Sequence, residues 1–79
     1  MEMETRIKEI IAKCAGADIS EITDGADLRH DLGMDSLDIY ETFSIIGEEF
    51  AVEISDTDAF NLDTVSNIVE CARKYIDAK

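Results

Sequence analysis

Residues that interrupt helices are scarce in this chain. Its 79 residues include no proline and only 4 glycines, which favours helices joined by polar loops. Apolar and polar residues do not alternate at period two for long enough to predict a sheet. The sequence also has no apolar run long enough for a signal peptide or a membrane span, so we expect a cytoplasmic protein.

Cysteine is rare as well. Cys14 and Cys71 lie far apart and form neither a CxxC motif nor a zinc-ligand pattern. Both fall on the apolar faces of expected helices, where a cysteine behaves as a small hydrophobic residue. We therefore expect both to be reduced residues of the core.

Positively charged residues are also scarce. Lysine and arginine number 7 against 19 aspartates and glutamates, which gives a net charge of −12 and a pI near 4.1. Such a charge disfavours binding to nucleic acid or to an anionic membrane surface. Between Arg29 and Arg73 there is no lysine or arginine at all, while acids recur throughout. A solvated face would explain part of this pattern. Acids without cations over so much of the chain favour a docking surface for partners with basic patches.

The residues that are present suit one small folded domain, residues 1–79. The chain is 46% hydrophobic and 33% charged, which is ordinary for a globular protein. Helical spacing of the apolar residues predicts an all-α fold, a small four-helix bundle with three main helices, a short third helix and a long first loop. The expected helices run from Met3 to about Ala15, from Asp35 or Ser36 to Phe50, around Asp56 to Asn61, and from Asp63 or Thr64 to about Tyr75.

The long connection from Ala17 to Met34 needs residues that hold it against the core. Four apolar residues at intervals are the candidates, and Ser20-Glu21-Ile22 is a candidate turn. The acids of this connection do not follow the EF-hand pattern, with its glycine and closing glutamate, so we predict no metal site. The four candidates are Ile19, Ile22, Leu28 and Leu32.

The stretch Asp31-Leu32-Gly33-Met34-Asp35-Ser36-Leu37-Asp38 organises the chain. Gly33 closes a turn, and Asp35 is a plausible N-cap because its carboxylate can accept hydrogen bonds from first-turn amides. Ser36 is then the first helical residue, with an exposed hydroxyl beside the positive end of the helix dipole. A phosphate esterified to that hydroxyl would lie where helix N-termini favour anions. Ser36 is therefore a candidate attachment point.

Other readings of Ser36 are less well supported. A catalytic nucleophile needs a base and a group that orients the base, but the only histidine is His30 and no Gly-x-Ser-x-Gly motif is present. Ser36 could also be an ordinary serine at a helix start. The carboxylates of Asp31, Asp35 and Asp38 form no closed ligand set, so any cation there is incidental.

The helix after Ser36 combines a core stripe with an unusual outer face. Its outer face carries the acids Asp38, Glu41 and Glu48 together with the apolar Leu37 and the aromatic Tyr40. Apolar anchors ringed by charge are typical of protein interfaces. The inward stripe consists of Ile39, Phe43, Ile46 and Phe50, with Thr42 beside it.

The motif from Asp31 to Asp38 resembles the phosphopantetheine-attachment motif of acyl carrier proteins, and the likeness to the bacterial type extends from about Thr5 to Tyr75. The resemblance implies a non-enzymatic monomer that carries acyl groups as thioesters on a 4′-phosphopantetheine arm at Ser36, with Asp35 supporting the motif. It implies loading by a phosphopantetheinyl transferase from coenzyme A. It also implies docking of ketosynthases, acyltransferases or ligases of fatty acid, polyketide or lipid biosynthesis on Leu37, Asp38, Tyr40, Glu41 and Glu48.

The same resemblance implies an acyl pocket inside the bundle. Thr42 and Ser44 stand where the housekeeping fatty-acid carrier has apolar residues, and Tyr40 and Phe60 are bulkier than usual. A carrier dedicated to a secondary or surface-lipid pathway is therefore also an open reading. An aminoacyl carrier, of the D-alanine or peptidyl type, is the alternative, and an unmodified acidic interaction module is a third reading. The residues that match the pocket lining are Ile39, Thr42, Phe43, Ile46, Ile54, Ala59, Leu62 and Ile68.

Overall fold

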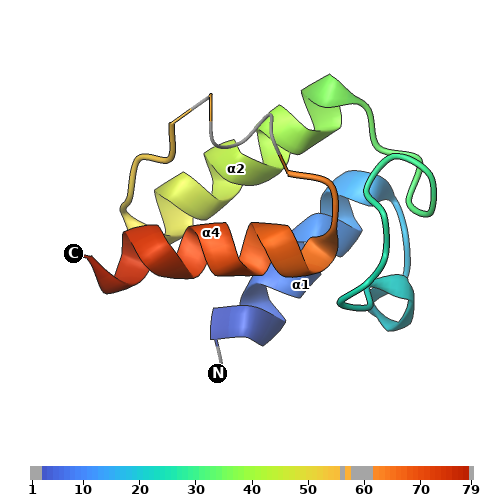
Figure 1. Ribbon diagram of the computed structural model, residues 1–79, viewed down its shortest axis with the longest axis horizontal. Coiled ribbons are helices and arrows are strands. Elements are labelled where there is room, and N and C mark those ends of the chain that lie inside the picture. The colour runs from blue at the N-terminus through green and yellow to red at the C-terminus, as the bar shows by residue number, and fades with distance from the viewer. Residues whose placement is uncertain (1–2, 56, 58–61, 79) are drawn as a thin grey trace.

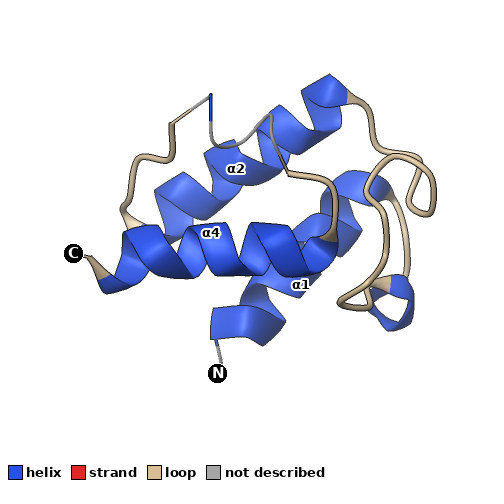
Figure 2. Cartoon of the chain, viewed as in Figure 1, coloured by secondary structure: helices blue, strands red, loops and turns tan. Residues whose placement is uncertain are grey.

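The computed structural model describes residues 3–55, 57 and 62–78. Its helices are α1 (Met3–Ala15), α2 (Ser36–Phe50) and α4 (Val65–Asp77), with a short 3₁₀ helix, η1 (Ile19–Glu21), after α1 (Figures 1 and 2). The described residues form no strand, only one isolated antiparallel bridge between Asp27 and Thr64. The predicted all-α fold is confirmed.

The three main helices begin and end close to where the sequence predicts. Helix α1 has the predicted bounds and stops at Gly16, whose φ of +68° suits the residue after a helix. Thr64 is the N-cap of α4, and its hydroxyl accepts a hydrogen bond from the Asn67 amide at 3.2 Å. Helix α4 ends at Asp77, two residues beyond the prediction. The predicted short helix from Asp56 to Asn61 lies outside the described residues except at Thr57.

Helix α1 contacts both α2 and α4, and the apolar faces of the three helices enclose the core. Both cysteines are half-buried against this core, and neither forms a disulfide. The buried helical residues are Ile7, Ile10, Ile11, Ala12, Ile39, Thr42, Phe43, Ile46, Val65, Ile68, Val69 and Ala72.

The long connection lies at the end of the bundle where α2 begins (Figure 1). Ile22 and Leu28 are buried as predicted, and Leu32 packs partly against the core. The prediction for Ile19 is wrong, because its side chain is 44% exposed. Asp18 and Glu21 cap each other's backbone around η1, so this turn satisfies its hydrogen bonds locally and projects from the surface. The chain returns to the core only at Ile22, and Met34 is an additional buried residue.

The end of α2 depends on a glycine. Ala51 adopts the left-handed conformation with φ 56°, and the amide of Val52 donates to the Gly47 carbonyl at 3.0 Å. A Cβ atom on Gly47 would lie 2.8 Å from the Val52 carbonyl oxygen. That contact is with backbone, which cannot rotate away as a flexible side chain can.

We expect Gly47→Ala to destabilise the domain, although alanine is the better helix former by about 1 kcal/mol. Overpacking typically costs about 1–3 kcal/mol, and a net loss near 1 kcal/mol lowers the melting temperature by roughly 5 °C. Gly25→Ala is the control, because no atom lies within 4 Å of its Cβ position. Thermal unfolding followed by circular dichroism measures both variants. A Gly47→Ala melting temperature above the parent's would contradict the predicted clash.

Candidate functional site

Ser36 is the first residue of α2, and its side chain is exposed. Asp35 caps the helix as predicted: its carboxylate accepts a hydrogen bond from the Asp38 amide at 2.9 Å, and the Asp38 carboxylate accepts one from the Asp35 amide at 3.2 Å. This reciprocal capping box satisfies two backbone donors that the first turn leaves unpaired. It therefore fixes the helix start on which Ser36 sits.

The segment that leads into Ser36 is anchored in the core. Leu28 is fully buried, its amide donates to the Asp63 carbonyl, and its carbonyl accepts from the Met34 amide, both at 2.8 Å. Met34 is also buried, and Gly33 makes the predicted turn with φ +66°. Burial and backbone hydrogen bonds therefore hold the segment before Ser36 in place, although Ser36 itself is exposed.

Arg29 is the site residue that sequence reasoning missed. Its Nη2 donates to Ser36 Oγ at 3.4 Å. The Asp27 carboxylate accepts hydrogen bonds from the backbone amides of His30 at 2.8 Å and Arg29 at 2.9 Å, which lower the pKa of this carboxyl. The available signal was that Arg29 is the single cation between Lys13 and Arg73. In sequence reasoning, Arg29 only marked where the stretch without cations begins.

His30 does not assemble with Ser36 into a catalytic pair in the described structure. His30 is exposed, and its hydrogen bond to Asp27 comes from its backbone amide rather than its ring. The Ser36 hydroxyl instead has the Arg29 guanidinium as its neighbour. A guanidinium stays protonated in proteins, so it cannot act as a general base.

The outer face of α2 combines apolar groups with acids, as expected. Leu37 is 71% exposed and Tyr40 is 50% exposed, next to the exposed Glu41 and Glu48. Within the described residues neither glutamate forms an ion pair. Asp38 is half-buried, and its carboxylate caps the helix. We call Leu37, Asp38, Tyr40, Glu41 and Glu48 the α2 face.

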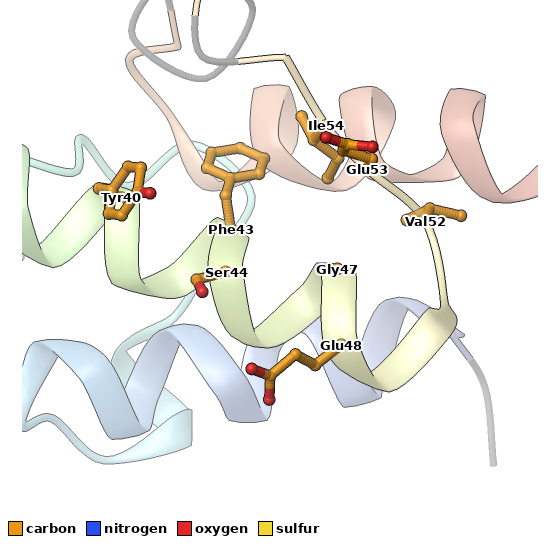
Figure 3. Close-up of a pocket in the computed structure, with 8 residues that line it drawn as sticks. All are labelled: Tyr40, Phe43, Ser44, Gly47, Glu48, Val52, Glu53 and Ile54. Atoms are coloured by element: carbon orange, nitrogen blue, oxygen red, sulfur yellow. The ribbon is translucent and has the colours of Figure 1, made fainter.

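A pocket of about 460 Å³ lies between α2 and the segment that follows it. Figure 3 shows Phe43 projecting from α2 and Ile54 on the following segment. Among the described residues, these are the two predicted lining residues that the pocket contains. Tyr40 and Glu48, predicted for partner binding, also line it. The further lining residues, which the sequence did not indicate, are Ser44, Gly47, Val52 and Glu53.

The other described residues predicted for an acyl pocket do not line this one. Four are buried in the core, where the Thr42 hydroxyl donates to the Asp38 carbonyl at 2.9 Å. Leu62 is half-buried against the core, and Ala59 lies outside the described residues. The four buried residues are Ile39, Thr42, Ile46 and Ile68.

Two negative findings apply to the described part of the chain. It contains no helix that is long and apolar enough to cross a membrane. It also contains no group of three or more histidine, cysteine, aspartate or glutamate residues arranged to hold a metal ion. Asp31, Asp35 and Asp38 therefore do not form such a group.

The chain matches the family model for the phosphopantetheine attachment site over residues 5–72. It belongs to this family. Proteins of the phosphopantetheine-attachment family carry a covalently bound 4′-phosphopantetheine group and serve as carriers rather than enzymes. A transferase loads them, and other enzymes process the group that they carry.

The fold is also that of a solved carrier. The crystal structure of an acyl carrier protein from Thermotoga maritima matches this carrier with a TM-score of 0.81 and 22% sequence identity. The match covers 98% of this chain and 95% of that chain. The helical arrangement in Figure 1 is therefore shared along nearly the whole carrier domain.

The start of α2 fits the prosthetic group of the family. The Ser36 hydroxyl is exposed, lies at a helix N-terminus and has a guanidinium 3.4 Å from its oxygen. Both the helix start and the guanidinium favour a phosphate ester at that oxygen. The chemistry of these groups therefore suits a phosphate-linked arm.

Charge compensation in this carrier is concentrated at α1. Every ion pair among the described residues includes Glu4, Arg6 or Lys8, which all belong to α1. The closest is between Arg6 and Glu49 of α2, and it holds the pKa of the Glu49 carboxyl below its ordinary value. The acids of the α2 face form no ion pair within the described structure.

We expect added salt to stabilise the domain, because self-repulsion from a net charge of −12 weakens the compact state. The Debye length shrinks from about 30 Å at 0.01 M salt to about 10 Å at 0.1 M. The melting temperature should therefore rise between these concentrations, and magnesium should act at lower concentration than sodium. Glu41→Gln is the matched variant and should respond less than the parent. A melting temperature that stays flat would mean that the charges are already compensated.

Proposed function

We propose that Ser36 carries the 4′-phosphopantetheine arm and that residues 1–79 form one acyl carrier domain. The exposed Ser36 hydroxyl at the capped start of α2, inside the family match, is the observation that carries this proposal. When bound, the arm supplies a thiol that holds acyl groups as thioesters. The residues of the chain present that arm and contribute no catalytic group.

Loading requires a separate transferase and coenzyme A. The Ser36 hydroxyl gives up its proton to a base of the transferase, and its oxygen forms the ester bond to the phosphorus that carries the pantetheine. The pyrophosphate bond of coenzyme A breaks in the same step, and adenosine 3′,5′-bisphosphate leaves. Asp35 keeps this oxygen in place through the capping box, since its carboxylate holds the first turn. We propose the cytoplasm as the location, where coenzyme A and its transferase are available to the folded chain.

Partners dock on the α2 face in this proposal. Its acids favour enzymes with basic patches, such as the transferase and the ketosynthases, acyltransferases or ligases that process the cargo. Leu37 and Tyr40 offer exposed apolar area next to Ser36. The net charge of −12 disfavours self-association, so we propose that the carrier works as a monomer.

The pocket beside α2 is the proposed site for the cargo. Phe43, Val52 and Ile54 offer apolar contacts for an acyl chain of fatty acid, polyketide or lipid biosynthesis. An aminoacyl cargo is the second candidate, because the carboxylates of Glu48 and Glu53 also line the pocket and would attract an ammonium group.

Intact-mass spectrometry tests the proposed function. The purified protein is incubated with coenzyme A and a broad-specificity phosphopantetheinyl transferase. We expect a gain of one phosphopantetheinyl group and the appearance of one new thiol that reacts with a thiol reagent under native conditions. Loading from acyl- and aminoacyl-coenzyme A, followed by thermal unfolding, then ranks the cargoes by the stability that each confers. No gain of mass would favour the unmodified interaction module.

A further inference from the structure

Arg29 is directed at a hydroxyl in a protein crowded with carboxylates. Its Nη2 donates to Ser36 Oγ at 3.4 Å, and within the described residues it forms no ion pair. By contrast, Arg6, Lys8 and Arg73 all pair with carboxylates. Its guanidinium therefore retains the capacity to bind an anion at Ser36.

The turn that carries Arg29 is held by hydrogen bonds to its backbone. The Asp27 carboxylate accepts the amides of Arg29 at 2.9 Å and His30 at 2.8 Å. The preceding residue, Leu28, is fully buried and donates its amide to the Asp63 carbonyl at 2.8 Å. The Arg29 side chain is exposed, but hydrogen bonds at Leu28, Arg29 and His30 hold the backbone that carries it. The fold therefore sets the position from which the side chain extends toward Ser36.

Loading brings a new negative charge to this place. The phosphodiester attached at Ser36 Oγ stands beside the carboxylates of Asp35 and Asp38, whose oxygens already accept backbone amides. The sequence has no lysine or arginine other than Arg29 between residues 14 and 72. A planar guanidinium donates two parallel hydrogen bonds to phosphate oxygens, a geometry that an ammonium cannot match.

We propose that Arg29 binds the phosphate of the arm attached to Ser36 and so restrains the root of the arm at the start of α2. This inference rests on the proposed function. In the unloaded protein the guanidinium contacts the hydroxyl, and in the loaded protein it contacts the anionic oxygens bonded at the same place. Arg29 is a binding residue for the prosthetic group and takes no part in bond making.

The test compares loaded and unloaded forms of the parent, Arg29→Gln and Arg29→Lys. Lys13→Gln is the control, because it removes the same charge from an exposed side chain that forms no ion pair in the described structure. Intact mass establishes that each form is loaded. Phosphorus NMR then reports the environment of the phosphodiester, nitrogen NMR reports the Arg29 side chain, and thermal unfolding gives the change in melting temperature on loading.

In the parent we expect loading to shift the Arg29 side-chain resonance. The phosphorus resonance should differ between parent and Arg29→Gln, coincide for parent and Lys13→Gln, and be only partly restored in Arg29→Lys. Loading should change the melting temperature more favourably in the parent than in Arg29→Gln, by roughly 2–4 °C, and salt should shrink this difference.

Two results would overturn the inference, and they are distinguishable. If every variant loads, and the phosphorus resonance and melting response are the same in the parent and Arg29→Gln, Arg29 does not bind the phosphate while the proposed function stands. If the parent gains no group at Ser36, the proposed function and the inference fall together.

Discussion

Ser36→Ala is expected to abolish loading completely while leaving the fold intact. The alanine lacks the oxygen that forms the ester, and no other exposed serine in the described part of the chain combines a helix start with the motif of the family. Stability should not fall, because Ser36 is exposed and alanine is a better helix former than serine. Intact-mass spectrometry after incubation with transferase and coenzyme A measures the loss.

The control for this variant is Ser20→Ala, which changes another exposed serine, in η1. It should gain the full mass of one group. Circular dichroism and melting temperature establish that both variants remain folded, so that a failure to load is not a failure to fold. Mass gain by Ser36→Ala would show that another residue accepts the arm and would remove the basis of the carrier proposal.

Tyr40→Ala is expected to weaken partner binding through faster dissociation. Truncation of a buried aromatic anchor can cost about 2 kcal/mol or more, which is roughly a thirtyfold loss of affinity. Tyr40 is half exposed in the isolated chain and stands beside Leu37 among acids, which is the arrangement of an anchor within a charged rim. Surface plasmon resonance with a cognate transferase measures both rates, and the change should depend little on salt.

Glu41→Lys is expected to slow the association of partners rather than to speed their dissociation. A rim charge steers association, and its effect is screened by salt. Association should therefore slow at low ionic strength and recover as salt is added. Glu70→Lys is the matched control, since it reverses an exposed charge on α4. If Glu70→Lys slows association while Tyr40→Ala and Glu41→Lys leave the kinetics unchanged, partners do not dock on the α2 face.

Short-range patterns in the sequence were sufficient to predict the helices and the capped start of α2. An N-cap, a glycine turn and a hydroxyl at the first helical position depend only on neighbours in the chain, which is why Asp35, Gly33 and Ser36 have their predicted geometry. The same is true of Gly16 at the end of α1. The helical period likewise separated the exposed Tyr40 from the buried stripe.

The contacts that the sequence did not indicate depend on how the loop and the helix ends fold back. Arg29 reaches Ser36 from a turn whose Leu28 is anchored to Asp63, far along the chain. Ile19 was expected in the core, but the cap around η1 turns that residue outward. One side of the pocket is formed by Val52, Glu53 and Ile54, which follow the left-handed turn at Ala51. That conformation is uncommon for alanine, so the sequence did not predict the turn.

The most direct measurement is tandem mass spectrometry of the loaded parent protein, with the modified residue located by fragmentation. One phosphopantetheinyl group is predicted, attached to Ser36 and to no other residue. Backbone fragments that contain Ser36 should carry the added mass, and fragments that lack Ser36 should not. A group located on any other residue, or a parent protein that takes up none, would contradict the account.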